Sequence, residues 1–164
     1  AEVIRVERLE GGEDRWVTPL ATSGDGAMFL QCNRNKRSLT LNPQTEEGAA
    51  IKRRLVESAD VVIVNLPEVA LKALGLDYDT LRAIKPDLVY VLGTAYGLGG
   101  PYSDRLGYDG IGQVMSGAIF RSGTPEAPMR CASPYVDFGT AMSLAAGPLA
   151  PPYPLPSTAP QSVV

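Results

Sequence analysis

The sequence contains no histidine among its 164 residues. A chain without histidine cannot supply a Ser-His-Asp triad, a Cys-His pair or a histidine-ligated metal centre. We therefore expect no metal site. Any catalysis must come from carboxylates, lysine, tyrosine, serine or cysteine.

Cysteines and long apolar runs are also scarce. The two cysteines, Cys32 and Cys131, lie far apart and fit no metal-ligand spacing. No stretch of about 18 apolar residues occurs, so we expect no membrane span. The first residues do not resemble a charged-then-apolar signal peptide. These absences indicate a reduced, cytoplasmic protein whose cysteines are buried as small apolar groups.

Positive charge is limited to one local cluster. The net charge of -3 and a pI near 5.0 argue against a nucleic-acid-binding protein, which needs a broad basic face. Residues 33–38 nevertheless form a basic run directly before the apolar residues 39–42. Lysine and arginine suit a phosphate-bearing ligand, although most such runs are solvated surface.

The apolar pattern indicates an α/β fold. With 45% hydrophobic and 20% charged residues, the chain can form one domain with a sizeable core. Strands are expected at residues 3–7, 39–42, 61–64 and 88–92, and helices at residues 45–56 and 78–84. This alternation predicts a Rossmann-like, doubly wound, mainly parallel sheet. The unbroken β-branched run at 61–64 predicts a strand buried on both faces.

Ligands of such sheets bind beyond the carboxyl ends of the strands. The residues at or just beyond the ends of the four predicted strands are Glu7 and Arg8, Leu41 and Asn42, Asn65 and Leu66, and Thr94 and Ala95. We expect these residues to form a common rim.

Two further helices are predicted, at residues 110–120 and 136–146. Asp137 stands near the start of the second, where backbone N–H groups favour a carboxylate. By residue type alone, a helix cap is favoured over a catalytic role. From Gly147 onward the density of proline predicts no helix. We therefore predict a domain over residues 1–146 and a disordered, proline-rich tail over residues 147–164.

Several segments together resemble one enzyme family. They are, in chain order, residues 33–41, 59–66, 74–78 (LGLDY), 97–102 (GLGGPY) and 107–109 (GYD). In this order they resemble the family III CoA-transferases, which include formyl-CoA transferase and the carnitine-dehydratase/bile-acid-inducible proteins. The resemblance covers residues 1–146 and implies an incomplete large domain of such an enzyme. We expect the natural start to be missing and the tail to result from a truncation or frameshift.

The resemblance implies transfer of CoA between an acyl-CoA and a small carboxylic acid, with Asp137 as the catalytic nucleophile. Asp137 lies 29 residues after Tyr108, and Thr140 is in register with the family's motif. The carboxylate would attack the thioester and pass through an aspartyl-CoA thioester. A carboxylate is already ionised at pH 7, so this chemistry needs no histidine base.

Tyr108 separates two activities within the family. The related acyl-CoA racemases are expected to carry histidine here as an acid/base group. A tyrosine with a pKa near 10 is a poor base at neutral pH, which disfavours the racemase alternative. For Tyr108 itself, a direct ligand role and a packed aromatic with a bonded hydroxyl both stay open.

The resemblance further implies CoA as a substrate, with no permanently bound cofactor. It carries CoA binding onto five positions that follow the predicted strands: Arg8, Leu41, Asn65, Leu66 and Ala70. Two positions depart from the family, since Ala73 replaces an arginine and Leu106 replaces a lysine of some members. Arg105 and Lys72 are the candidates to compensate.

Two alternatives accompany the transferase interpretation. The chain could bind CoA without turnover, because the family's second domain and its later glycine-rich loop would be missing. It could instead be a redox Rossmann protein, although no Gly-x-Gly-x-x-Gly follows the first strand. The family forms interlocked homodimers, and we expect this chain by itself to be inactive. The donor and acceptor acids are not predicted.

Overall fold

A computed structural model describes residues 1–149 of the chain. The chain divides into two compact units, residues 1–54 and the part from residue 55 onward. Within residues 1–149, each helix is too short or too polar to span a lipid bilayer.

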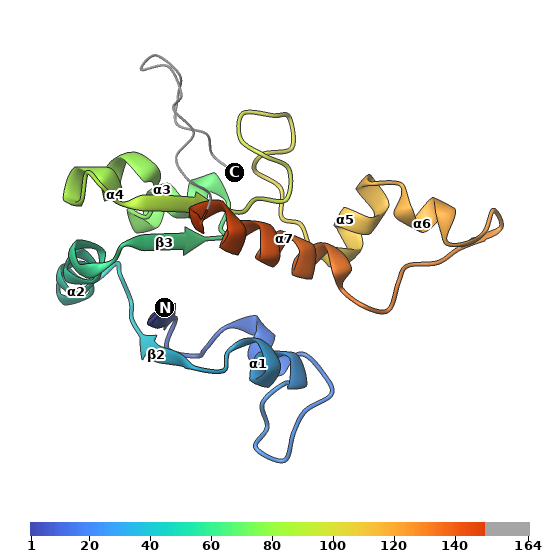
Figure 1. Ribbon diagram of the computed structural model, residues 1–164, viewed down its shortest axis with the longest axis horizontal. Coiled ribbons are helices and arrows are strands. Elements are labelled where there is room, and N and C mark those ends of the chain that lie inside the picture. Colours follow the sequence, from blue (N-terminus) through green and yellow to red (C-terminus); the bar gives the residue numbers. More distant parts are fainter. Residues whose placement is uncertain (150–164) are drawn as a thin grey trace. The chain divides into compact units, whose positions relative to one another are not determined.

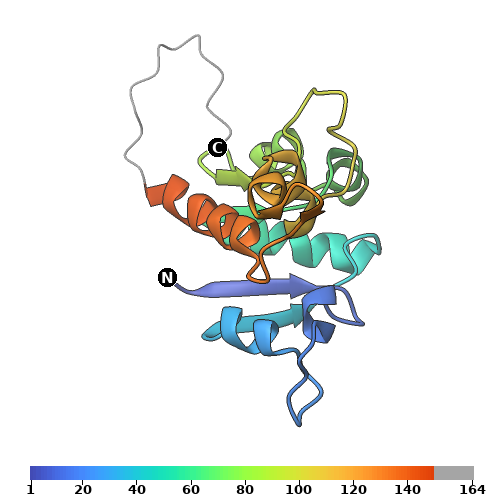
Figure 2. The same cartoon turned by 90° about the vertical axis from the view of Figure 1, so that its right-hand side faces the viewer.

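The first unit is built on one parallel strand pair. Its elements are β1 (Val3–Glu7), the 3-10 helix η1 (Glu13–Trp16), α1 (Ala27–Cys32), β2 (Lys36–Thr40) and the larger part of α2 (Glu46–Ser58). Strands β1 and β2 run side by side (Figure 2), with Val3 opposite Lys36 and Glu7 opposite Thr40. The N–H of Leu41 donates to the Glu7 carbonyl at 2.8 Å. Arg8 and Leu41, which directly follow β1 and β2, therefore lie at the same edge of the sheet.

A buried carboxylate fixes the loop that follows β1. Glu7 is only 6% exposed. Its two oxygens accept hydrogen bonds from Arg15 at 2.8 and 2.9 Å, and further bonds from the Gly12 N–H and the Ser38 hydroxyl. The Arg15 guanidinium in turn lies 4.0 Å from the centroid of the Phe29 ring. This network ties β1, the loop and α1 together, because a buried carboxylate is tolerated only when it is paired and hydrogen-bonded.

The second unit holds another parallel pair, β3 (Val61–Val64) and β4 (Val89–Leu92), with Val61 opposite Val89 and Val64 opposite Leu92. Along the chain, α3 (Glu68–Leu74) and α4 (Tyr78–Ile84) connect β3 to β4 (Figure 1). Asp77 caps α4 by accepting bonds from the Thr80 N–H and hydroxyl. The core gathers Val56, Leu81 and Leu88.

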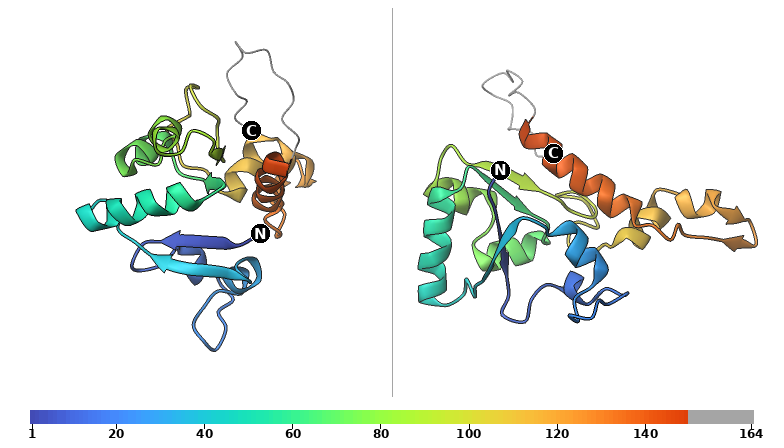
Figure 3. Two further views of the ribbon diagram at one scale, coloured as in Figure 1. Left: turned by 60° about the vertical axis from the view of Figure 1, so that its left-hand side comes forward. Right: turned by 60° about the horizontal axis from the view of Figure 1, so that its bottom comes forward.

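Residues 109–149 of the second unit are mainly helical, with one short hairpin. Its elements are α5 (Asp109–Met115), α6 (Ala118–Arg121), the hairpin strands β5 (Gly123–Thr124) and β6 (Ala127–Pro128), α7 (Tyr135–Ala146) and the 3-10 helix η2 (Gly147–Leu149). Figures 1 and 3 show α7 running from α5 toward the end of β4. A Cβ on Gly112 would lie 2.6 Å from Val136, so glycine allows α5 and α7 to approach closely.

The predicted α/β fold with parallel strands is confirmed. Strand β1 and helix α4 have the predicted bounds, and α7 begins one residue before the predicted start. Helix α3 was not predicted, although Glu68 in its first turn and Gly75 after its end are ordinary helix signals.

Three local predictions are wrong. The helix expected at residues 110–120 is broken, because Gly117 adopts a left-handed φ of 76° between α5 and α6. Strand β3 is not buried on both faces, since Val61 is 38% and Ile63 53% exposed. Its other face packs on the core through Val62. Residues 147–149, expected to be non-helical, form a single 3-10 turn.

Two further predictions need correction. The basic run does not precede its strand but enters it, because β2 already begins at Lys36. Two of its charged side chains already have partners within the protein. Lys36 donates a hydrogen bond to Asn33, and Arg37 is paired with Glu2. Both cysteines are exposed rather than buried, Cys32 at the end of α1 and Cys131 in the segment before α7. The predicted tail lies, from residue 150, outside the described residues.

Candidate functional site

The carboxyl edge of the first strand pair carries Arg8 and Leu41, as the sequence predicts. The Arg8 side chain is 61% exposed. Its Nε donates to the Gly11 carbonyl at 2.9 Å, and its only ion pair among residues 1–149 is a 3.8 Å contact with Glu13. Leu41 is half-buried beside it. A mostly solvated guanidinium anchored by one hydrogen bond can still accept an anion.

The carboxyl edge of the second strand pair forms a recess of about 60 Å³. It brings together the predicted CoA-binding residues Asn65, Leu66 and Arg105, and it also contains Thr94 and Ala95, which were predicted to lie on the rim. The remaining lining residues are Pro67, Ser103, Leu106 and Gly107. Ala70 does not line the recess and lies half-buried on α3. The loop between β4 and α5 therefore folds back onto the residues that follow β3.

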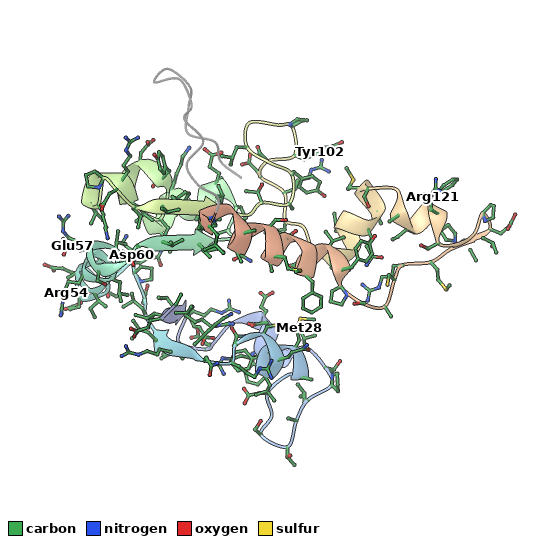
Figure 4. All side chains as sticks on the ribbon, viewed as in Figure 1. Met28, Arg54, Glu57, Asp60, Tyr102 and Arg121 are labelled. Atoms are coloured by element: carbon green, nitrogen blue, oxygen red, sulfur yellow. The ribbon has the colours of Figure 1, made fainter. Side chains whose placement is uncertain are left out.

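Arg105 is held over an aromatic ring in this loop. Its Cζ lies 4.2 Å from the centroid of Tyr102, which contacts Tyr96 edge-on at 5.6 Å. Figure 4 shows Tyr102 on the loop that follows β4. The Tyr102 ring thus supports the Arg105 cation. The stack orients the planar guanidinium, and no residue among 1–149 accepts a hydrogen bond from its N–H groups.

Asp137 lies in the first turn of α7 and is exposed. Its carboxylate accepts no hydrogen bond and forms no ion pair with any residue in the described part of the chain. Partial burial, and secondarily the charge of Asp109, raise the pKa of Asp137 above its usual range. The alternative that Asp137 caps its own helix is not what the structure shows, because another residue takes that role.

The cap of α7 comes from α5. Asp109 is 8% exposed, and its Oδ1 accepts hydrogen bonds from the N–H groups of Val136 at 2.9 Å and Asp137 at 3.3 Å. Its Oδ2 accepts a bond from Gln113 at 2.6 Å. Gln113 is itself buried and accepts a bond from the Cys131 N–H. Neither role is apparent from the sequence, because the bonded groups lie far apart along the chain.

Tyr108 occupies the N-cap position of α5, directly before Asp109. Its side chain is 65% exposed, and none of the described residues hydrogen-bonds its hydroxyl. Its carbonyl accepts bonds from the N–H groups of Ile111 and Gly112. The alternative of a packed aromatic with a bonded hydroxyl therefore does not fit. The structure thus shows an exposed phenol one residue before Asp109.

A larger hollow of about 580 Å³ lies along α7. It is lined by the end of β4, the loop after it and one face of α7; from the helix come Tyr135, Val136, Gly139, Thr140, Ser143 and Leu144. Asp137 does not line the hollow, whereas its neighbour Val136 and the predicted motif residue Thr140 do. The structure thus gives α7 one face on an apolar hollow and a separate exposed carboxylate. No cluster of three potential metal ligands occurs within residues 1–149.

Comparison with known proteins gives one consistent result. The family model for CoA-transferase family III matches residues 1–153, which extends beyond the predicted boundary at residue 146. The chain is 43% identical over 148 residues to succinate–glutarate CoA-transferase of Agrobacterium fabrum, covering 85% of this chain and 37% of the relative. It is 35% identical over 145 residues to succinyl-CoA:glutarate CoA-transferase of Mus musculus, covering 87% and 33%.

Solved structures that match this chain include a protein of the CAIB/BAIF family. A crystal structure of a CAIB/BAIF family protein from Brucella suis matches with a TM-score of 0.80 and 38% identity, covering 91% of this chain and 42% of that one. A protein of Mycobacterium tuberculosis matches with a TM-score of 0.81 and 35% identity. The chain therefore spans well under half the length of these relatives.

Proposed function

The chain belongs to CoA-transferase family III, and on that premise we propose that the protein transfers CoA from an acyl-CoA to a carboxylic acid with Asp137 as the nucleophile. The observation that carries the proposal is the free carboxylate in the first turn of α7. Asp109 already satisfies the N–H groups that Asp137 would otherwise cap. An exposed carboxylate without hydrogen bonds is available to attack.

The reaction divides into balanced steps. An Asp137 oxygen attacks the thioester carbonyl, the C–S bond breaks, and CoA thiolate leaves as a mixed anhydride forms. The thiolate attacks the Asp137 acyl carbon, which releases the donor acid and gives an aspartyl-CoA thioester. The acceptor acid attacks that thioester to form a second anhydride and free thiolate. The thiolate then attacks the acceptor's acyl carbon, which yields the new acyl-CoA and restores the carboxylate.

The raised pKa of Asp137 supports this role. A more basic carboxylate is a better nucleophile, provided that it stays ionised at the working pH. The cause is partial burial together with the nearby Asp109 charge. No other base is required, which accords with a chain that contains no histidine.

CoA contacts are assigned, within each unit, to the carboxyl edge of that unit's own strand pair. We propose Arg8 and Arg105 as phosphate contacts, since both present exposed guanidinium groups. The rest of the CoA molecule would be contacted by Leu41, Asn65, Leu66 and Ala70. The acyl group of the substrate would be contacted by Tyr108. Arg8, Leu41, Asn65 and Leu66 directly follow strands, and ligands of parallel sheets bind at that edge.

The substrates to test first come from the relatives' names. Both transferases described above are named for succinate or succinyl-CoA together with glutarate. Succinyl-CoA as donor and glutarate as acceptor are therefore the first pair.

We also propose that the protein forms a homodimer. On helix α7, Met142 is 75% and Phe138 37% exposed. Together they form an apolar surface that a second copy of the chain can cover.

Steady-state transfer between succinyl-CoA and labelled glutarate tests the proposal. Asp137→Asn should lower kcat by at least about a thousandfold, because it removes the covalent route. Asp104→Asn, a change of another exposed acid, is the matched control and should leave kcat unchanged. Binding of CoA without any transfer would favour the non-catalytic alternative. An Asp137→Asn enzyme with full activity would end the proposal.

A further inference from the structure

Asp109 and Gln113 form the buried polar pair of the second unit. Asp109 is 8% and Gln113 1% exposed, and they lie one helical turn apart on α5 with 2.6 Å between the Gln113 amide nitrogen and Asp109 Oδ2. No cation pairs with Asp109 within residues 1–149. A buried carboxylate without a counter-ion is costly unless N–H groups satisfy it. Its position is therefore explained by the donors that it meets.

Those donors are the first amides of α7. The first N–H groups of a helix lack partners within the helix. The N-cap residue of α7, Pro134, makes no side-chain capping bond. Asp109 Oδ1 instead accepts the N–H groups of Val136 and Asp137. A residue 28 positions earlier in the chain thus holds the backbone of Asp137.

Gln113 extends this hold to the segment before α7. Its Oε1 accepts the Cys131 N–H at 2.8 Å, and its Nε2 makes a longer 3.4 Å bond to the Cys131 carbonyl. The side chain is thereby fixed with its amide N–H groups toward Asp109. Since Gln113 presents a donor there, the partner oxygen of residue 109 must be an acceptor.

We propose that Asp109 is a positioning residue for Asp137, fixing the first turn of α7 so that the Asp137 carboxylate stays free and aimed at the thioester. The proposal rests on the function proposed above. It assigns Gln113 the supporting role of orienting Asp109. A misplacement of about 1 Å at a reacting group can cost about a hundredfold in rate, so a cap that sets the Asp137 backbone bears directly on catalysis.

The test separates geometry from charge. In Asp109→Asn, the amide oxygen can still accept the N–H groups of α7. The new NH₂ group then faces the NH₂ group of Gln113, so two donors are opposed and no hydrogen bond forms between them. Adding Gln113→Glu supplies an acceptor both for that NH₂ group and for the Cys131 N–H. Only the long bond to the Cys131 carbonyl is lost. The double variant restores the cap with the same total charge, moved one turn along α5.

Two quantities are measured for each variant. Amide hydrogen exchange reports the protection of the Val136 and Asp137 N–H groups, and mass spectrometry reports the rate at which acyl-CoA modifies Asp137. Asp109→Ala and Asp109→Asn should lose protection and slow the modification by about 10- to 100-fold. The double variant should recover both. Glu126→Ala, which removes an exposed acid from the β5–β6 turn, should change neither.

The outcomes are distinct. Lost amide protection with an unchanged modification rate in Asp109→Ala would overturn the positioning role. So would a double variant that regains protection but not rate, because charge rather than position would then govern Asp137. If the unaltered protein forms no adduct on Asp137, the proposed function fails and this inference fails with it. If it forms the adduct and all Asp109 variants match it, only the inference fails.

Discussion

The guanidinium of Arg105 lies over the ring of Tyr102, with 4.2 Å between Cζ and the ring centroid, beside the recess that also holds Asn65 and Leu66. This arrangement predicts a phosphate contact. Arg105→Ala should weaken CoA binding by about 10- to 100-fold, which corresponds to the loss of one charge-assisted contact. Arg105→Lys should recover only part, because lysine lacks the planar fork. Isothermal titration calorimetry with CoA measures both.

The matched control is Arg121→Ala on α6, which lies away from that loop (Figure 4). It removes the same charge without touching the recess, so CoA affinity should stay within about twofold at moderate salt. Equal losses from both alanine variants would show that only net charge matters, and the proposed contact would then be wrong.

Glu7 should be a strong stability determinant of the first unit. Hydrogen bonds from Arg15 hold the pKa of Glu7 far below its ordinary value of 4.5, against the opposing effect of burial. Glu7→Gln should lower the free energy of unfolding at pH 7 by about 2–4 kcal/mol, because it leaves Arg15 without its buried partner. Urea titration measures this, with Glu2→Gln on the surface as the control.

The pH dependence of Glu7 has a definite sign. The folded chain binds the Glu7 proton less tightly than the unfolded chain does. Its contribution is therefore complete above pH 4.5 and is lost as the pH falls below that value. The difference between the parent and Glu7→Gln should shrink in acid. A difference independent of pH between 7 and 3 would contradict the assignment.

Asp137 should have the opposite linkage. Its pKa is raised in the folded chain, so the folded chain binds this proton more tightly, and stability decreases as the pH rises above 3.8. Asp137→Asn should therefore stabilise the protein at pH 7 while abolishing transfer. The gain should stay below about 1 kcal/mol, since the side chain is exposed. Thermal unfolding at pH 7 and pH 3 tests this, because the gain should vanish in acid.

Leu81 should dominate the core of the second unit. It has no exposed surface and packs with Val56 and Leu88. Leu81→Ala should lower the free energy of unfolding by about 2–5 kcal/mol through lost burial and a remaining cavity. Leu9→Ala, at a leucine that is 81% exposed, is the matched control and should change it by less than about 0.5 kcal/mol. Similar losses in the two variants, by urea unfolding, would contradict the assigned core.

Local signals accounted for most of the regular elements. Helix α4 was predictable because Asp77 caps it and Pro86 follows its end. Strand β4 was predictable from its run of apolar and β-branched residues. Gly117 carried the signal for the break between α5 and α6, but a glycine inside an apolar helical pattern does not reveal its φ angle.

Tertiary relationships were not readable from the sequence. The β-branched run of β3 is compatible with a strand buried on one face or on both. Whether Ile63 is buried depends on which other elements pack on its face of the strand pair, and here it is 53% exposed. Asp109 was visible only as part of the Gly-Tyr-Asp motif. Its bonds to amides of α7 join residues 27 and 28 positions apart, a separation that no local pattern encodes.

The account depends most on a covalent intermediate at Asp137. The direct measurement is borohydride trapping after incubation with succinyl-CoA, followed by peptide mass spectrometry. An aspartyl-CoA thioester would be reduced to the alcohol, so the account predicts homoserine in place of Asp137, dependent on succinyl-CoA and absent from Asp137→Asn. Efficient CoA transfer with an unmodified Asp137 peptide, or with the modification at another carboxylate, would contradict it.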